Sequence, residues 1–149
     1  MALNKNLKNT FEWPKPLSKK ATVGKTLIHL MSENGWAGAY PWSKKANNIA
    51  PTLVGGSKKH GGPDLGPTRA RQQWRSLGVD GIGIADYAPD IKFPENGLPR
   101  LTVRMAARIQ GFPDSWQFPG RKTASYRQIG NAFPPAVAKA VGIQILTTI

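Results

Sequence analysis

The sequence predicts a mixed α/β fold with much irregular structure, in which a lobe of short strands precedes two helices near the C-terminus. The 16 glycines and 13 prolines among 149 residues indicate many turns. Between residues 35 and 83 they interrupt the chain every few positions, so only short strands fit there. After residue 100, apolar side chains recur at helical spacing. A chain of this length is expected to form one small core.

The first half is expected to contain two helices and one clear strand. Residues 22–32 carry an apolar face that predicts a short helix. Residues 49–54 are the best candidate strand. A second helix is predicted over residues 68–77, with Thr68 as its N-cap and Pro67 just outside it. The remaining segments predict loops.

Two helices are predicted in the last third of the chain. Thr102 can cap a helix that runs to about Gln110, and Gly111 would end it in a left-handed conformation. The final helix begins at the pair Pro134 and Pro135, since proline is favoured in a first turn. Gly130 and Asn131 are expected to form a turn between the two helices. The final helix carries four apolar residues along one side: Val137, Ala138, Val141 and Ile145.

The charge is strongly positive and unevenly placed. Lysine and arginine number 21 against 8 acidic residues, a net charge of +13. Residues 1–75 hold 13 basic and 3 acidic side chains, and residues 1–20 indicate an extended basic arm. Such an excess favours polyanions, nucleic acid first and an anionic membrane surface second. Composition alone is equally compatible with a solvated basic surface.

Several classes of protein and site are excluded or disfavoured. No apolar run approaches the length of a membrane span, and the start MALNKNLKNTF lacks the apolar region of a signal peptide, so a cytoplasmic protein is expected. The absence of cysteine excludes disulfides, thiolate metal sites and a cysteine nucleophile within these residues. His29 and His60 are isolated, so no metal is expected. Gly24, Lys25 and Thr26 do not complete a phosphate-binding loop, because Lys19 occupies the position of its first glycine.

Two stretches carry a family resemblance. The segments RLTVRMAARIQGFPDSW and SYRQIGNAFPPAVAKAVG resemble, in order and spacing, the last two blocks of the DNA cytosine-5 methyltransferases. The preceding APTLVGGSKKHGGPDLGPTRARQQW is similar to a target recognition region of that family. The resemblance implies three parts. Residues 1–44 would be a basic arm with a short helix, 45–98 the target recognition region, and 99–149 blocks whose helices complete a partner's Rossmann-like methyltransferase domain.

The same resemblance shows what these residues lack. The family's Gly-rich cofactor loop, Pro-Cys dipeptide, Glu-Asn-Val block and Gln-x-Arg-x-Arg block do not occur here. In the family a cysteine thiolate attacks carbon 6 of a flipped cytosine, which activates carbon 5 toward the methyl group of S-adenosylmethionine. The expected function is therefore a C-terminal subunit or fragment of a DNA cytosine-5 methyltransferase of a restriction-modification system, binding double-stranded DNA and inactive without a second polypeptide that supplies the cysteine.

Two alternatives stay open. The first is a sequence-selective DNA-binding protein derived from a methyltransferase and without enzymatic role. The second is a basic RNA-binding protein of ribosomal type, which leaves the two C-terminal blocks unexplained.

The resemblance implies a cofactor site and a DNA site. The residues expected near S-adenosylmethionine are Gly130, Asn131, Ala132 and Trp116. The alternatives are a polar turn with Asn131 in a left-handed conformation and burial of Trp116 in the core. The residues expected near DNA are Thr52, Leu53, Lys58, Lys59, His60, Arg69 and Arg71. The alternative for the latter set is a flexible basic loop without base contacts.

Further residues are expected to support the fold: Thr102, Arg104, Arg108, Gly111 and Asp114. Arg104 and Arg108 are expected to form buried ion pairs with backbone or carboxylate groups, Asp114 among them. Met105 stands where the family usually has glutamate, so the capping box with Thr102 is expected to be lost. The apolar side of the final helix is expected to be an intersubunit surface, or else part of the chain's own core.

Overall fold

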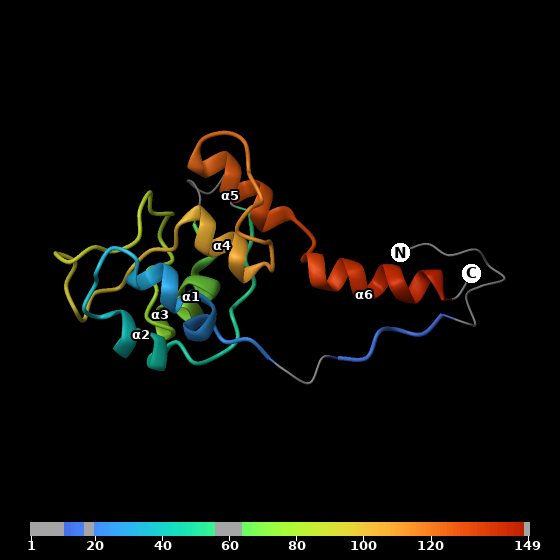
Figure 1. The fold of residues 1–149 in the computed structure, drawn as a ribbon, viewed down its shortest axis with the longest axis horizontal. Coiled ribbons are helices and arrows are strands. Elements are labelled where there is room, and N and C mark those ends of the chain that lie inside the picture. The colour runs from blue at the N-terminus through green and yellow to red at the C-terminus, as the bar shows by residue number, and fades with distance from the viewer. Residues whose placement is uncertain (1–10, 17–19, 56–63, 148–149) are drawn as a thin grey trace.

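The computed structural model describes residues 11–16, 20–55 and 64–147. Within these residues the chain forms six helices joined by long irregular segments (Figure 1). The helices are α1 Val23–Ser32, α2 Ala39–Lys45, α3 Thr68–Ser76, α4 Val103–Ile109, α5 Lys122–Asn131 and α6 Pro135–Leu146.

The predicted strands are absent from the described residues, so the mixed α/β expectation is wrong for this part of the chain. Residues 49–54 are extended, but they lie against helices and pair with no neighbouring strand. Pro51 lacks a backbone donor, which weakens any ladder at that point. The β contacts described are isolated bridges, of Ala85 with Thr102 and of Asp90 with Asn34 and Gly35. The described fold is mostly helical.

The first helix forms as predicted and packs on a helix that was not predicted. Thr22 caps α1 by accepting a hydrogen bond from the Lys25 amide at 3.4 Å. Gly24 lies so close to α2 that a Cβ at this position would be 2.8 Å from the carbonyl carbon of Ser43. Because a side chain would force the helices apart, Gly24 serves helix packing here. Pro41 obscured α2 in the sequence, although a first turn tolerates proline.

Tryptophans connect the irregular segments to the core. Trp36 donates from Nε1 to the Pro94 carbonyl at 3.0 Å, and its ring meets Phe93 edge to face. Trp42 donates to the Gly78 carbonyl at 3.0 Å. Trp74 is the buried residue of α3 and has no exposed surface. The Trp74 Nε1 has no hydrogen-bond partner among the described residues. The paired N–H groups of Trp36 and Trp42 hold loops that have no regular hydrogen bonding of their own.

The start of α3 differs from the prediction. Pro67 is the residue before the helix, and Thr68 is its first helical residue, so Thr68 is not the N-cap. The Thr68 hydroxyl instead accepts a hydrogen bond from Arg71 at 3.1 Å. A proline at the cap position offers no side-chain acceptor, and this end of the helix has no side-chain cap.

Helix α4 confirms the predicted boundaries and corrects the prediction about its cap. The Thr102 hydroxyl accepts from the Met105 amide at 3.2 Å, and the Met105 sulfur accepts from the Thr102 amide at 3.4 Å. The capping box therefore persists, with a thioether in place of a carboxylate. Gly111 ends the helix with φ +87°, as predicted, and the Phe112 amide returns to the Ala107 carbonyl.

The expected turn at Gly130 and Asn131 belongs to a helix. Both residues form the last turn of α5, which packs on α4 and buries Ser125, Tyr126 and Ile129. Its N-cap is Arg121, which makes no side-chain capping bond. Without a capping residue, the sequence carried no start signal for this helix.

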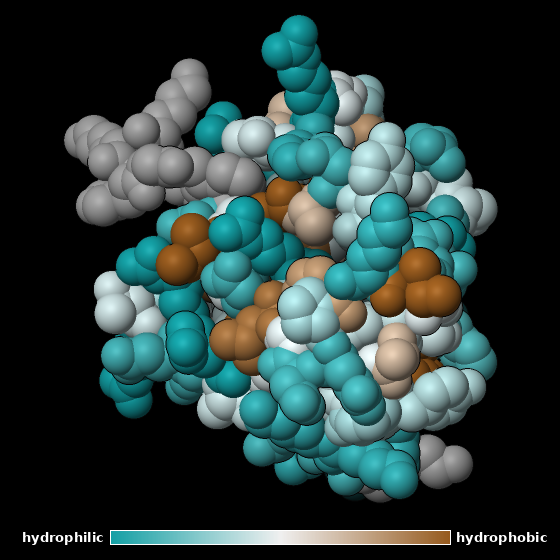
Figure 2. All heavy atoms as spheres, turned by 90° about the vertical axis from the view of Figure 1, so that its left-hand side faces the viewer, coloured by the Kyte–Doolittle hydropathy of each residue, from teal (hydrophilic) through white to brown (hydrophobic). Residues whose placement is uncertain are grey.

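Helix α6 has the predicted bounds but is not part of the core. It extends away from the other helices and packs on none of them (Figure 1). None of its side chains is buried, and Val137, Ile143 and Leu146 are 45%, 51% and 72% exposed. The opposite end of the molecule is largely hydrophilic, with apolar groups in small separate patches (Figure 2). Among the described residues, no helix is long and apolar enough to cross a membrane.

Candidate functional site

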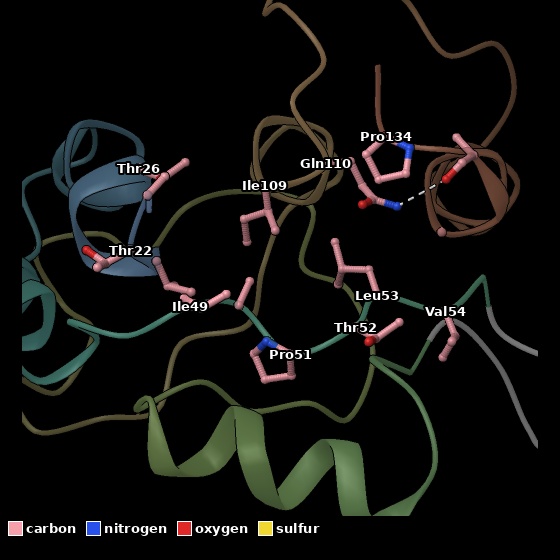
Figure 3. Close-up of a pocket in the computed structure, with 15 residues that line it drawn as sticks. Thr22, Thr26, Ile49, Pro51, Thr52, Leu53, Val54, Ile109, Gln110 and Pro134 are labelled. Carbon is pink, nitrogen blue, oxygen red and sulfur yellow. Dashed lines mark hydrogen bonds between the residues drawn. The ribbon is translucent and has the colours of Figure 1, made fainter. Parts of the chain in front are cut away.

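A pocket of about 560 Å³ lies where four parts of the chain meet. These are the start of α1, the extended segment 49–54, the end of α4 and the junction of α5 with α6 (Figure 3). Thr52 and Leu53, expected near DNA, line it together with Gly130 and Ala132, expected near the cofactor. The structure thus brings these four residues of the two predicted sites to one place.

The extended segment forms one wall of the pocket. The Asn48 side chain accepts from the Ile49 amide, and the Asn48 carbonyl accepts from the Val23 amide, so the segment is fixed to the start of α1. Leu53 is buried in the core, whereas Thr52 is exposed. Of these two residues, Thr52 presents its side chain to solvent beside the pocket.

Two glycines, Gly55 and Gly130, form the contact between the extended segment and the end of α5. A Cβ on Gly130 would lie 2.5 Å from the Gly55 Cα and 2.6 Å from the Val54 carbonyl carbon. A Cβ on Gly55 would lie 2.6 Å from Oδ1 of Asn131. The end of α5 therefore lies directly on the backbone of the segment expected to recognise DNA. Asn131 is helical and not left-handed, and it lies against Gly55 rather than lining the pocket.

Gln110 was not identified from the sequence, although it holds the pocket together. Its Nε2 donates to the Ile129 carbonyl at 3.0 Å. It also donates to the Ala132 carbonyl at 3.5 Å, the hydrogen bond drawn in Figure 3. These carbonyls belong to the end of α5, where a helix leaves carbonyls without partners. A lone glutamine before a helix-ending glycine gives no sequence signal for this role.

The chemistry of the pocket is that of a binding site. Its described lining contains no charged side chain, and its polar side chains are three threonines and Gln110 among apolar walls. Such a surface suits a flat or partly apolar group held by a few directed hydrogen bonds. None of its lining residues is a nucleophile of the cysteine type or a carboxylate, so covalent attack on a base would need a group from elsewhere.

Trp116 lies apart from the other residues expected near the cofactor. It lines a second pocket of about 390 Å³ together with Arg104, Asp114 and Lys122. Its ring is 57% exposed and lies 5.7 Å from the ring of Phe112. The structure therefore neither buries Trp116 in the core nor places it beside Gly130.

Arg104 and Arg108 pair with Asp114, but at the surface and not in the interior. Arg104 is 3.2 Å from Asp114, and Arg108 makes two hydrogen bonds to the same carboxylate. The Arg108 hydrogen bond, reinforced by Arg104, lowers the pKa of Asp114. All three groups keep solvent contact, because a loop carries Asp114 past the outer face of α4. Arg104 also lies 4.0 Å from Glu33.

The other residues expected near DNA, besides Thr52 and Leu53, fall into three groups. Lys58, Lys59 and His60 lie outside the described residues. Arg69 is exposed on α3. Arg71 is half-buried and engaged, because its Nη1 is 3.3 Å from Asp64.

The chain matches known proteins over nearly its whole length. The profile of the family described as C-5 cytosine-specific DNA methylase matches residues 2–147. The chain is similar to Type II methyltransferase M.NaeI of Lentzea aerocolonigenes, with 55% identity covering 97% of this chain and 35% of the relative. It is similar to Type II methyltransferase M.NgoMIV of Neisseria gonorrhoeae, with 51% identity covering 98% of this chain and 46% of the relative.

A mouse relative, DNA (cytosine-5)-methyltransferase 1, is 53% identical over 30% of this chain and 3% of its own length. The chain spans between a third and a half of the length of the two bacterial relatives. No solved structure matches it.

Proposed function

The chain belongs to the C-5 cytosine-specific DNA methylase family, and we propose that it provides the target recognition region and the C-terminal part of a DNA cytosine-5 methyltransferase. These 149 residues contain no cysteine. The nucleophile would therefore come from a partner polypeptide or from a longer form of the same protein. Residues 45–98 would recognise double-stranded DNA, and residues 99–149 would complete the catalytic domain.

Helix α6 is the observation that carries this proposal. It has 12 residues, all of them apolar except Lys139 and Gln144, and buries none of its side chains. A helix of this length is marginal in water without tertiary packing. Val137, Val141 and Ile145 recur at four-residue spacing and would face one surface. Since the relatives are two to three times as long as this chain, the rest of their methyltransferase domain is the proposed occupant of that face.

The pocket is the proposed meeting point of the cofactor and the target base. The family uses S-adenosylmethionine, which supplies the methyl group when bound. We place the junction of cofactor and target base at the pocket, since Thr52 and Leu53 meet Gly130 and Ala132 there. Gly130 would keep α5 close to the extended segment at Val54 and Gly55, and Gln110 would fix the end of α5 against α4. The apolar walls would exclude water from the bound base.

Charge supports DNA as the partner of the recognition region. The net charge of +13 gives long-range attraction to a polyanion, and α3 contributes three arginines and no acidic residue. Arg69 is exposed and suited to a phosphate or base contact. Arg71 would act through Asp64 and the shape of the region, because its guanidinium is already paired.

Assembly on α6 tests the proposal. The chain would be co-expressed with the product of a neighbouring reading frame that holds the missing blocks, and the complex recovered through a tag on that product. Val141→Asp should lower recovery at least tenfold, because it places a charge in the apolar face. Lys139→Ala changes the net charge equally, lies on the opposite side of α6 and should leave recovery unchanged.

Equal recovery of both variants would contradict the assigned surface. Failure of the wild-type chain to form any complex, with selective DNA binding retained by the chain alone, would favour the non-enzymatic DNA-binding alternative.

A further inference from the structure

A buried tyrosine contacts the two described flanks of residues 56–63, one ending at Gly55 and the other beginning at Asp64. Tyr126 lies in α5 and has no exposed surface. Its hydroxyl is 3.1 Å from the Val54 carbonyl oxygen and 3.3 Å from the Asp64 carbonyl oxygen. These two carbonyls lie ten positions apart in sequence, one on each side of the segment. One side chain therefore links Val54 and Asp64 to α5.

The hydroxyl is a permanent donor. Burial, reinforced by the nearby Asp64 charge, raises the pKa of Tyr126 well above its usual range. The hydroxyl is therefore protonated at neutral pH, and its single proton is shared between the two carbonyls or alternates between them. A tyrosine that only filled space would need no such pair of acceptors.

Each of the two flanks, at Val54 and at Asp64, is also anchored independently of Tyr126. At the first end, the backbone of Val54 and Gly55 lies on Gly130 of α5. At the second end, the Asp64 carboxylate pairs with Arg71 of α3 at 3.3 Å, and the Leu65 amide donates to the Gly81 carbonyl. The first end thus belongs to α5 and the second to α3. The Tyr126 hydroxyl bridges the two.

We propose that Tyr126 is a positioning residue for target recognition: by holding the Val54 and Asp64 carbonyls together, its hydroxyl fixes the two described flanks of residues 56–63 relative to α5. The proposal rests on the proposed function. In sequence, Lys58, Lys59 and His60 lie between the two carbonyls. Tyr126 itself would touch neither DNA nor cofactor, because it is buried. Its effect would therefore fall on discrimination between DNA sites.

Tyr126→Phe in the assembled enzyme tests this directly, since it removes the hydroxyl and keeps the ring. Plasmid DNA methylated by wild type and variant would be read by bisulfite sequencing. The measured quantity is the ratio of methylation rates at the preferred site and at sites differing by one base pair. The ratio should fall roughly tenfold, equivalent to about 1.4 kcal/mol of discrimination. At the preferred site kcat and the KM for S-adenosylmethionine should stay within about twofold.

Tyr40→Phe is the matched control, because Tyr40 is 69% exposed and its ring lies on the surface of α2. It should leave the ratio unchanged. A folded Tyr126→Phe enzyme with the wild-type ratio would overturn the proposal. So would an equal loss of kcat at every site, which is what a purely structural role produces. Thermal unfolding shows whether the variant is folded.

A second variant keeps the test decisive if Tyr126→Phe fails to fold. Arg71→Gln frees the Asp64 end from α3 without touching the core, and should lower the ratio about threefold. An unchanged ratio would overturn the proposal. A wild-type complex without methylation would refute the proposed function instead. The same ratio would then be measured by competition binding between duplexes, and a chain that shows no selectivity there would overturn both.

Discussion

Replacing Gly130 by alanine tests the contact on which the pocket depends. In the structure a Cβ at this position would lie 2.5 Å from the Gly55 Cα and 2.6 Å from the Val54 carbonyl carbon. Both are backbone atoms, so no side-chain rotation can relieve the clash. Either the end of α5 or the backbone of Val54 and Gly55 would have to move.

The magnitude follows from two opposing terms. Forcing one extra carbon into a closely packed contact costs about 1–3 kcal/mol. Alanine in place of glycine in a helix contributes up to about 1 kcal/mol in the other direction. The expected net loss for Gly130→Ala is therefore about 1–2 kcal/mol. Gly142→Ala in α6 is the matched control, because nothing lies within 4 Å of its added Cβ. It should be neutral or stabilising by up to about 1 kcal/mol.

Urea unfolding followed by tryptophan fluorescence measures both variants, since the chain has five tryptophans. The free energy of unfolding should differ between Gly130→Ala and Gly142→Ala by about 2 kcal/mol, with unchanged dependence on urea. Equal stability of the two variants would refute the reasoning. It would show that α5 does not lie on Val54 and Gly55, and that the pocket is not closed from that side.

Three other predictions concern the cap, the surface ion pairs and DNA. Thr102→Ala should lower the free energy of unfolding by about 1 kcal/mol, because it removes the acceptor of the Met105 amide; a urea titration in which the variant matches wild type would contradict this. Asp114→Asn should cost about 0.5–1 kcal/mol at pH 7, because the carboxylate is paired but solvent-exposed. Since the folded pKa of Asp114 lies below its unfolded value of about 3.9, the stabilisation is present above that value and lost as pH falls through the folded pKa. Wild type and Asp114→Asn should therefore converge in acid, and a difference that persists there would rule out the ion pairs as its cause. Arg69→Ala should weaken DNA binding at all sequences and reduce the slope of log affinity against log salt by about 1, as measured by fluorescence anisotropy at several salt concentrations. An unchanged slope would remove Arg69 from the DNA contacts.

Among the described helices, α1, α3, α4 and α6 could be predicted from the sequence, whereas α2 and α5 could not. Thr22 and Thr102 cap α1 and α4, and the prolines before α6 mark its start. By contrast, α2 contains Pro41, and α5 begins at Arg121 without a capping side chain. Local sequence signals predict loops for such segments, because their helicity comes from tertiary packing. The predicted strands failed because residues 49–54 pack on helices, which no pattern of residues reveals.

Some residues of the candidate site could likewise be predicted from the sequence, and others could not. The family resemblance led to Gly130, Ala132, Thr52 and Leu53, which the structure places in one pocket. The contacts of Gln110 could not be predicted, because its acceptors are carbonyls about 20 positions away. Tyr126 reaches across more than 60 residues to its acceptors. Hydrogen bonds to distant backbone leave no mark in the sequence of the donor.

Transfer of labelled methyl from S-adenosylmethionine to DNA tests the central claim most directly. The chain would be purified with the polypeptide that supplies the cysteine, and each would also be assayed alone. The account predicts methylation only when both are present, and its loss when Asn131 is replaced by alanine or α6 is removed. An inactive mixture with selective DNA binding by this chain alone would contradict it.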